Sequence, residues 1–431
     1  MVDEISDNRW LMRSVTTQRL LGACATYADV LFDYIAGLAS SQDTGGASQD
    51  TGGANGADSS EPGSLRVEDY VKAGKSVMRL MNFPQQMAFF FSVFSRRKGS
   101  LNREEGLVML HTCCTLGYYC AGVSTLSVAA DDVFLVAMWD SLRGGEEVVS
   151  VESATTWCSR HCPGIWDAVH LCTRLALFGG HSIGLEGALP HPDLLQTVDE
   201  GDSLLSPSIL WVLSTVLPSV YVPPSKLTGD NKAILGSHLP LSKVLTGSNF
   251  HLMYSSNDHG LSTNRFNHHV FSYNAPTLMF VSFDRHLYCV AVDSEWREGV
   301  KRWGGGDCQL IQLLPVFKSL QSGSGLLYFN TLDRRMPKQL QVGVDVKRLP
   351  LQIDAGFSSV KHYSVDVPLE RLEVWGCGGE SILKDQLSQK QWEQKEADKQ
   401  KNRKLKIDDW NDNPDKELLN MGGITTDHAE R

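Results

Sequence analysis

Hydrophobic residues change their spacing near residue 218, and that change constrains the fold of this chain more than any other feature. Before it, apolar residues recur at intervals of three and four, the period of an α-helix with one buried face. After it, short runs of β-branched, aromatic and aliphatic residues are separated by Gly, Asn, Asp and Pro, which is typical of strands joined by turns. The sequence therefore predicts an α+β protein: an all-helical N-terminal domain, then a two-sheet antiparallel β-sandwich with flanking helices, then a charged helical tail.

These patterns predict the individual elements. Helices of the first half are expected over residues 9–39, 67–81, 85–95, 103–122, 130–141 and 151–178. Strands of the second half are expected at Leu252–Tyr254, Thr277–Phe283, Tyr288–Asp293, Leu310–Pro315, Leu326–Asn330, Pro350–Asp354 and Arg371–Trp375, with one helix at Asn264–Val270.

Composition marks the boundaries between regions. The segment SQDTGGA at residues 41–47 is repeated at 48–54 in a polar, glycine-rich stretch that cannot offset the entropy of ordering, so it is predicted to be a disordered loop. The composition changes again at Glu380, and Leu383–Lys406 is rich in Lys, Glu and Gln, which predicts an exposed helix with charge pairs. The expected division is an N-terminal helix (1–39), the loop (40–65), a helical domain (66–217), a joint (218–248), a β domain (249–379) and the tail (380–431).

Charge and hydropathy exclude several classes of function. The net charge of −10 provides no basic field for nucleic acid. Apolar runs such as Gln86–Phe94 and Ile209–Val222 are too short or too interrupted to span a membrane. The first residues lack the pattern of a signal peptide, and Val2 stands where N-myristoylation requires glycine. We therefore expect a cytoplasmic protein without an integral membrane segment.

Ten cysteines are scattered through apolar segments, at positions 24, 113, 114, 120, 158, 162, 172, 289, 308 and 377. In a chain of this length without a secretory signal they are predicted to be reduced, mostly buried thiols. The cluster of Cys158, His161, Cys162, His170 and Cys172 could bind zinc, but its spacings match no common zinc finger. A helix that carries core cysteines is the favoured interpretation.

Residues Phe94–Glu105 (FSRRKGSLNREE) have the spacing of an EF-hand loop between two helices. Glycine is at the sixth position, an aliphatic residue at the eighth and glutamate at the twelfth. The first, third and fifth positions supply oxygen ligands to calcium in such loops, and here they are Phe94, Arg96 and Lys98. The sequence therefore predicts a helix–loop–helix that binds no calcium.

An ordered series of short motifs lies between residues 249 and 378. It runs Leu252-Met253-Tyr254-Ser255-Ser256, Gly260-Leu261-Ser262, Asn264-Arg265-Phe266, Pro276-Thr277-Leu278, Trp296, Gly304, Leu313-Leu314-Pro315, Leu327-Tyr328 and Leu372-Glu373-Val374-Trp375-Gly376. In this order the motifs resemble the TLDc domain. The chain departs from the family pattern at His259, which replaces an acidic residue, and in a glycine-rich stretch that is reduced to Gly343.

The helical half carries a second resemblance. Thr156-Trp157-Cys158, Pro163-Gly164, Leu210-Trp211 and Leu217-Pro218 are similar to the region before the TLDc domain in the mTOR-associated lysosomal TLDc proteins, whose first half looks like a degenerate EF-hand fold. The resemblance implies a non-catalytic regulatory protein that binds subunits of the vacuolar proton pump. It also implies links to oxidative-stress protection and lysosomal mTOR signalling, and a peripheral position at lysosomal or vacuolar membranes.

Catalytic alternatives depend on weak patterns. Asp258, His259, Ser262, His268 and His269 could be arranged as a hydrolase triad, but Ser262 lacks the G-x-S-x-G turn. Adjacent histidines on a helix also point about 100° apart. The GGGD sequence at 304–307 lacks the Gly-Lys-Ser/Thr of a phosphate loop. We predict that the protein is not an enzyme and needs no cofactor or metal. An antioxidant enzyme with exposed cysteines is the alternative, and a calcium-regulated adaptor is a third interpretation.

Structural roles are favoured for the TLDc-like motif residues. Trp296 and Trp375 are predicted as core or edge aromatics, Ser262 or Thr263 as the cap of the following helix, and Gly260 and Gly376 as turn residues with positive φ. The same structural set includes Tyr254, Ser255, Ser256, Phe266, Pro276, Thr277, Pro315 and Glu373. Candidate partner-binding residues are the apolar anchors of the polar tail, Trp392, Trp410, Leu418 and Leu419.

Overall fold

The computed structural model describes residues 10–12, 24–43, 64–123, 128–129, 131–178, 202–222, 239–246, 250–401, 418 and 421–422. The chain divides into two compact units, residues 1–380 and 381–431. Helices and antiparallel sheets occur together, which confirms the prediction of a mixed α+β protein with antiparallel pairing.

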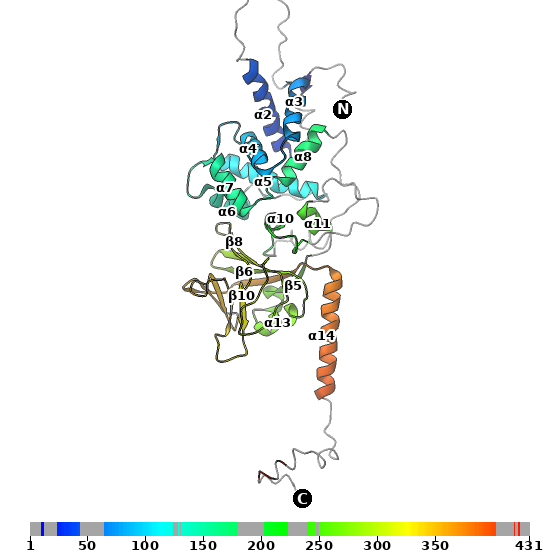
Figure 1. Cartoon of the computed structure of the whole chain (residues 1–431), viewed down its shortest axis with the longest axis vertical. Helices are drawn as coiled ribbons and strands as arrows, with labels where there is room; N and C mark the ends of the chain where they lie inside the picture. The colour runs from blue at the N-terminus through cyan, green and yellow to red at the C-terminus, as the bar shows by residue number, and fades with distance from the viewer. Residues whose placement is uncertain are drawn as a thin grey trace, which may run out of the picture. The chain divides into compact units, whose positions relative to one another are not determined.

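Helices make up most of the described residues before 247 (Figure 1). They are α2 (Ala25–Asp43), α3 (Val67–Met78), α4 (Phe83–Phe94), α5 (Arg103–Cys120), α6 (Val133–Arg143), α7 (Val151–His161), α8 (Asp167–Phe178), α10 (Pro207–Val216) and α11 (Pro240–Thr246). The single helix predicted over 151–178 is wrong, because it is two helices, α7 and α8. Pro163 lies between them, and proline inside a helix removes a hydrogen bond and clashes with the preceding turn.

Two short strand pairs correct the prediction of an all-helical first half. Strand β1 (Trp10–Met12) pairs with β2 (Ser64–Arg66), and β3 (Ser100–Leu101) pairs with β4 (Val149–Ser150). The helix predicted over 9–39 is therefore wrong at its start. A partner strand far along the chain supplies the hydrogen bonds of β1, and hydrophobic spacing carries no sign of such a partner. Helix α2 and strand β2 also extend into the predicted loop 40–65, of which residues 44–63 lie outside the described residues.

The β domain contains two antiparallel sheets. The six-stranded sheet has the order β5 (His251–Ser255), β15 (Arg371–Gly376), β6 (Thr277–Phe283), β7 (His286–Val292), β8 (Gln309–Leu314) and β9 (Lys318–Ser322). The five-stranded sheet is a meander of β10 (Leu327–Asn330), β11 (Gln339–Val342), β12 (Leu351–Asp354), β13 (Ser359–His362) and β14 (Val365–Pro368). Short helices α12 (Ser256–His259) and α13 (Thr263–Val270) follow β5.

The strands β9, β11, β13 and β14 were not predicted. Their sequences, KSLQS, QLQV, SVKH and VDVP, mix polar and apolar residues over four or five positions. Strands β9 and β14 also lie at sheet edges, where a strand needs no continuous apolar run. These strands are therefore fixed by pairing with their neighbours rather than by their own hydrophobic pattern.

The central strands β6 and β7 of the six-stranded sheet are buried on both faces. Met279 and Val281 belong to a hydrophobic cluster that both sheets share. Leu278 and Phe280, whose side chains point to the opposite face, belong to the core of the helical region. Because both faces are covered, β6 is a nearly continuous apolar run, as expected for a strand without a solvent-exposed side.

Phe317, in the connection between β8 and β9, provides a second contact with the helices. Its ring is fully buried and lies edge-on to Phe134 of α6, with 5.7 Å between ring centroids, and 6.0 Å from the Trp157 ring of α7. The backbone N–H of Ser319 donates to Nδ1 of His161 at 3.2 Å. The β8–β9 connection thus anchors the six-stranded sheet to helices α6 and α7.

Candidate functional site

The TLDc-like motif residues hold one another in place. Tyr254 is fully buried, and its hydroxyl donates to the carbonyl oxygen of Gly260 at 2.6 Å. Gly260 has a φ of 72°, which is the left-handed backbone predicted for it. The indole N–H of Trp296 donates to Oγ1 of Thr277 at 2.8 Å, and Phe266 lies edge-on to Trp296 at 5.1 Å. Residues that are distant in sequence therefore form one interlocked core.

The serines of the motif contact backbone. The Ser255 hydroxyl accepts a hydrogen bond in the first turn of α12, and the Ser256 hydroxyl accepts the N–H at the second residue of β15. Ser262 occupies the N-cap position of α13, but its side chain makes no capping bond. The neighbouring Thr263 hydroxyl donates to the carbonyl of Ala355 instead. The predicted side-chain cap is therefore wrong, because the nearby loop takes the hydroxyl of Thr263.

Gly376 is needed for close packing rather than for positive φ. It lies within strand β15, and a Cβ atom there would lie 2.6 Å from both Nε2 of His251 and the hydroxyl of Tyr273. The prediction of a left-handed turn at Gly376 is therefore wrong. The two prolines of the motif also have structural roles. The carbonyl of Pro276 accepts the N–H of Cys377 at 2.9 Å, and a cis peptide bond precedes Pro315.

Glu373 joins the β domain to the segment before α10. The side chain is only 1% exposed, and its carboxylate accepts the backbone N–H of Leu204 at 3.0 Å and the Ser203 hydroxyl at 3.1 Å. Arg371 donates to it at 2.9 Å, and Trp375 donates its indole N–H at 3.3 Å. Burial raises the pKa of Glu373, although these donors and the Arg371 charge act in the opposite direction. The buried carboxylate therefore holds the segment before α10 against strand β15.

The tail contains an exposed helix, α14 (Glu380–Lys401). Trp392 is 63% exposed on it, and Leu387 is 50% exposed. Glu396 and Lys399 form one of its charge pairs, at 2.6 Å. Further along, Leu418 is also exposed. The predicted anchors Trp410 and Leu419, and residues 402–406 of the predicted tail helix, lie outside the described residues.

The structure brings two of the histidines together but builds no triad. The imidazole rings of His259 and His269 have centroids 3.8 Å apart, and Nδ1 of His259 accepts the backbone N–H of Ser255 at 3.2 Å. The rings of His268 and His269 are nearly perpendicular, at 87°. Within the described part of the chain, no hydrogen bond connects Ser262 to a histidine. This geometry provides no activated serine.

The comparison with protein families assigns the second half of the chain. The family model described as the TLDc domain matches residues 223–378. Residues 223–378 form a TLDc domain. The matched range begins within the segment that we predicted as a joint, before the first described strand.

The similarity of this chain to known proteins extends beyond the TLDc domain. Three of them are named "Restriction of telomere capping protein 5". The Kluyveromyces lactis protein is 23% identical over 342 residues, 61% of this chain and 55% of the relative. The Candida glabrata protein is 25% identical over 44% of this chain and 46% of the relative, and the Zygosaccharomyces rouxii protein is 26% identical over 43% and 45%. The chain spans about half the length of these relatives, whose names do not single out the lysosomal branch.

The EF-hand-like loop before the TLDc domain contains a lysine in place of an ion. Nζ of Lys98, at the fifth position, lies 2.7 Å from Oε1 of Glu105, at the twelfth. Glu105 also forms a capping box with Asn102 at the start of α5. The pKa of Glu105 is lowered: partial burial acts to raise it, but the hydrogen bonds from Lys98 and Asn102 and the Lys98 charge outweigh this. The ammonium group thus replaces the charge that calcium would supply.

Strand pairing shows a second loop of the same kind. Leu101, the eighth residue of the first loop, pairs with Val149. Counting from Val149 as eighth places Leu142 first, Gly144 third, Glu146 fifth and Ser153 twelfth. In both loops the following helix, α5 or α7, then begins at the tenth position. The helical region therefore contains a pair of EF-hand-like units. The second could not be recognised from the sequence, because Glu147 replaces the glycine at the sixth position and Ser153 replaces the glutamate at the twelfth.

All ten cysteines are buried free thiols. Burial raises the pKa of Cys113, Cys158 and Cys289, which disfavours the reactive thiolate. The candidate zinc ligands have other contacts: His161 accepts from Ser319, and Sγ of Cys162 lies 3.5 Å from a threonine hydroxyl. The described residues contain no group of three or more metal-ligating side chains. None of the described helices is long and apolar enough to cross a membrane.

The GGGD segment surrounds an aspartate rather than a phosphate. Oδ1 of Asp293 accepts the N–H of Gly305 at 2.8 Å, and Oδ2 accepts the N–H of Asp307 at 3.0 Å. Partial burial acts to raise the pKa of Asp293, but the backbone hydrogen bonds lower it overall. A Cβ at Gly305 would lie 2.3 Å from Oδ2, so the glycine permits this close approach. The backbone N–H groups of this loop therefore bind the carboxylate of Asp293.

Proposed function

We propose that this protein is a non-catalytic regulatory protein that acts by binding other proteins, with subunits of the vacuolar proton pump as the leading partners. One observation carries the proposal: Trp392 is 63% exposed on a helix of Lys, Glu and Gln residues. An exposed tryptophan on a polar helix is a common anchor for a groove on a partner. The TLDc domain supports the regulatory class, and the resemblance to the lysosomal TLDc branch supports the choice of partner.

The same resemblance supports a cytoplasmic protein with peripheral association at lysosomal or vacuolar membranes, connected to mTOR signalling and oxidative-stress protection. The alternative, a cysteine-based antioxidant enzyme, needs an accessible thiol of low pKa. The buried thiols of this chain, such as Cys113 and Cys158, have raised pKa values and argue against it.

The name of the relatives suggests a second candidate role, in the restriction of telomere capping. It rests on 23% identity over 342 residues that include part of the helical region as well as the TLDc domain. The net charge of −10 favours a role through protein contacts over direct binding to DNA.

The test is capture of proton-pump subunits from solubilised vacuolar or lysosomal membranes by the full chain, quantified by mass spectrometry. Trp392→Ala should reduce capture at least about tenfold, because a buried interfacial tryptophan is typically worth about 2 kcal/mol or more. Gln391→Ala, on the same helix, is the matched control and should capture normally. The melting temperature of both variants should equal that of the wild type.

Three outcomes would contradict the proposal. Normal capture by Trp392→Ala and by Trp410→Ala would move the binding surface away from the tail. Early melting of either variant would show that the tryptophan supports the fold instead of a partner. Absence of pump subunits from the wild-type capture would remove the pump from the proposal altogether.

A further inference from the structure

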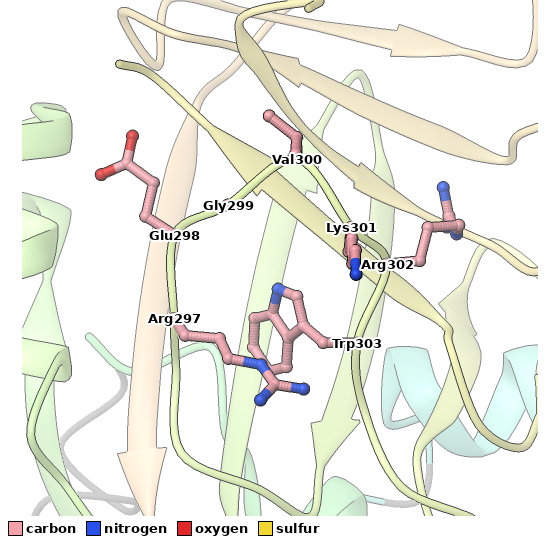
Figure 2. A pocket seen from close by; sticks show the side chains of 7 residues that line it. All are labelled: Arg297, Glu298, Gly299, Val300, Lys301, Arg302 and Trp303. Atoms are coloured by element: carbon pink, nitrogen blue, oxygen red, sulfur yellow. The ribbon is translucent and has the colours of Figure 1, made fainter. Parts of the chain in front are cut away.

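The connection between β7 and β8 forms a pocket beside the interlocked motif core, with the Trp303 ring 5.4 Å from the Trp296 ring. It has a volume of about 430 Å³ and is lined by Arg297, Glu298, Gly299, Val300, Lys301, Arg302 and Trp303. Figure 2 shows these residues as an arch, with Gly299 and Val300 at its crest and the Trp303 indole inside it. A volume of this size is within the range of small-molecule sites, so the pocket can accept more than a single ion.

The arch is fixed by bonds to the five-stranded sheet. The backbone N–H and carbonyl of Trp303 pair with those of Leu327 at 2.8 and 3.0 Å, and the N–H of Gly299 donates to the carbonyl of Phe329 at 2.8 Å. The guanidinium group of Arg302 donates to the carbonyl oxygens of Gly325 and Leu326, both at 2.9 Å. The backbone of the arch is therefore fixed before any ligand arrives, which lowers the entropic cost of binding.

Trp303 has a buried donor without an acceptor. The residue is 3% exposed, and its Nε1 has no hydrogen-bond partner among the described residues. Figure 2 shows Nε1 on the side of the indole that faces the crest of the arch. Two other buried indoles do have acceptors: Trp296 donates to Thr277, and Trp157 donates to Ser141 at 2.7 Å. Buried donors are normally satisfied, so the N–H of Trp303 indicates a place for an acceptor atom of a ligand.

The charged side chains of the pocket that are left to bind a ligand are positive. The guanidinium carbon of Arg297 lies 5.9 Å from the centroid of the Trp303 ring, and Lys301 is exposed beside it. Neither cation has an acidic side chain at ion-pair distance in the described part of the chain. Glu298, the one carboxylate of the pocket, accepts from the backbone and hydroxyl of Thr331. The groups left to bind a ligand are thus one neutral donor and two cations.

We propose that this pocket binds a carboxylate carried on a short apolar stem. One carboxylate oxygen accepts the indole N–H of Trp303, Lys301 and Arg297 balance the negative charge, and the stem contacts the side chain of Val300. Two sources have this chemistry, the Glu or Asp side chain of a partner protein and a free small dicarboxylic acid. The site lies on the TLDc domain and does not depend on the proposed role of the tail.

The test uses the ¹⁵N-labelled full chain, with the indole signal of Trp303 assigned by its loss in Trp303→Phe. N-acetylglutamate N-methylamide represents a protein side chain, glutarate represents a free diacid, and N-acetylglutamine N-methylamide is the uncharged control of equal shape. The Trp303 N–H signal should move downfield and saturate with an acid, and should not move with the amide. Tighter binding of the glutamate derivative assigns the site to protein partners, and tighter binding of glutarate assigns it to small acids.

Variants of the two exposed cations, Arg297 and Lys301, test the proposal even if Trp303→Phe disturbs the fold. Arg297→Gln and Lys301→Gln should each weaken binding by about two- to fivefold, the range for solvent-exposed ion pairs. The matched control is Lys361→Gln, an exposed lysine on β13 of the same domain. It should bind like the wild type. The proposal is overturned if neither acid shifts the indole signal, if the amide shifts it equally, or if Arg297→Gln and Lys301→Gln bind both acids unchanged.

Discussion

The two sheets of the TLDc domain differ in what covers their outer faces. On the six-stranded sheet, the outward residues Leu278 and Phe280 are fully buried in the core of the helical region. On the five-stranded sheet, the outward residues Gln352 and Lys361 are polar, partly or fully exposed, and paired across β12 and β13. One sheet is thus covered on both faces and the other on one.

This difference shows what the helical region does for the TLDc domain. The outward face of the six-stranded sheet carries large apolar side chains such as Leu278, Phe280 and Trp375, so it needs a cover to remain out of water. The EF-hand-like helices provide that cover, and Phe317 and Glu373 hold it at two separate places. The folded unit is therefore larger than the 223–378 range that defines the domain.

The largest expected effect tests the shared core directly. Phe280→Ala should lower the free energy of unfolding by about 3–5 kcal/mol, because it leaves a cavity between the six-stranded sheet and the helices. Gln352→Ala, at an outward position of the other sheet, should change it by less than about 0.5 kcal/mol. Urea unfolding followed by tryptophan fluorescence measures both. Equal, small losses would mean that the helices do not cover the sheet in solution.

The same difference explains which strands could be predicted from the sequence. Strand β6, buried on both faces, is the apolar run TLMFVSF, and its predicted bounds are those of the structure. Strand β11 is only QLQV, and its glutamines have the polarity expected of a loop, so it was missed. Trp10–Met12 was assigned to a helix for a related reason, since its pairing partner Ser64–Arg66 lies far along the chain.

The functional contacts were less predictable than the fold. Motif resemblance identified Glu373, but its acceptor role depends on Ser203 and Leu204, which hydrophobic spacing cannot connect to it. Phe317 carried no signal beyond being one aromatic after the Leu313-Leu314-Pro315 motif. The orphaned N–H of Trp303 is a property of the folded arch and cannot be derived from residue order.

The next largest effect concerns the hydrogen bonds between Glu373 and the segment before α10. Glu373→Ala should lower the free energy of unfolding by about 1–3 kcal/mol, because the N–H of Leu204 and the hydroxyl of Ser203 lose their acceptor while buried. Chemical denaturation at neutral pH measures the loss. Asp366→Ala, an exposed carboxylate on β14, is the control and should be neutral. No loss at Glu373 would show that the segment before α10 is not held by this carboxylate.

Glu373 also predicts a direction of pH dependence. Its pKa is raised above the ordinary value of 4.5, chiefly by burial, so the folded state binds the proton more tightly than the unfolded state. Its contribution to stability is fully present below pH 4.5 and is lost as the pH rises through the raised pKa. Glu373→Gln removes the titrating group, so this contribution should be missing from its stability profile. An unchanged profile would contradict the assignment.

A smaller effect, of opposite sign, is expected at His161. Burial lowers its pKa below 6.5, and the charges of Arg160 and Lys318 lower it further. The unfolded state then binds more protons between pH 6.5 and the folded pKa, so stability should fall as the pH decreases through that window. Protonation would also displace the N–H of Ser319 from Nδ1. His161→Gln should flatten this part of the profile, and an equally steep profile would point to other groups.

The smallest expected effect separates a covering role for the helices from calcium sensing. The Lys98–Glu105 pair is exposed on the lysine side, so Lys98→Ala should lower the free energy of unfolding by only about 0.2–1 kcal/mol. Neither protein should bind calcium stoichiometrically in the micromolar range, because Phe94 and Arg96 still occupy ligand positions in the variant, and Leu142 and Gly144 occupy them in the second loop. Isothermal titration calorimetry measures this. A calcium site in the wild type would make the helical region a sensor. A site that appears only in Lys98→Ala would mean that the ammonium group, and not the missing oxygen donors, excludes the ion.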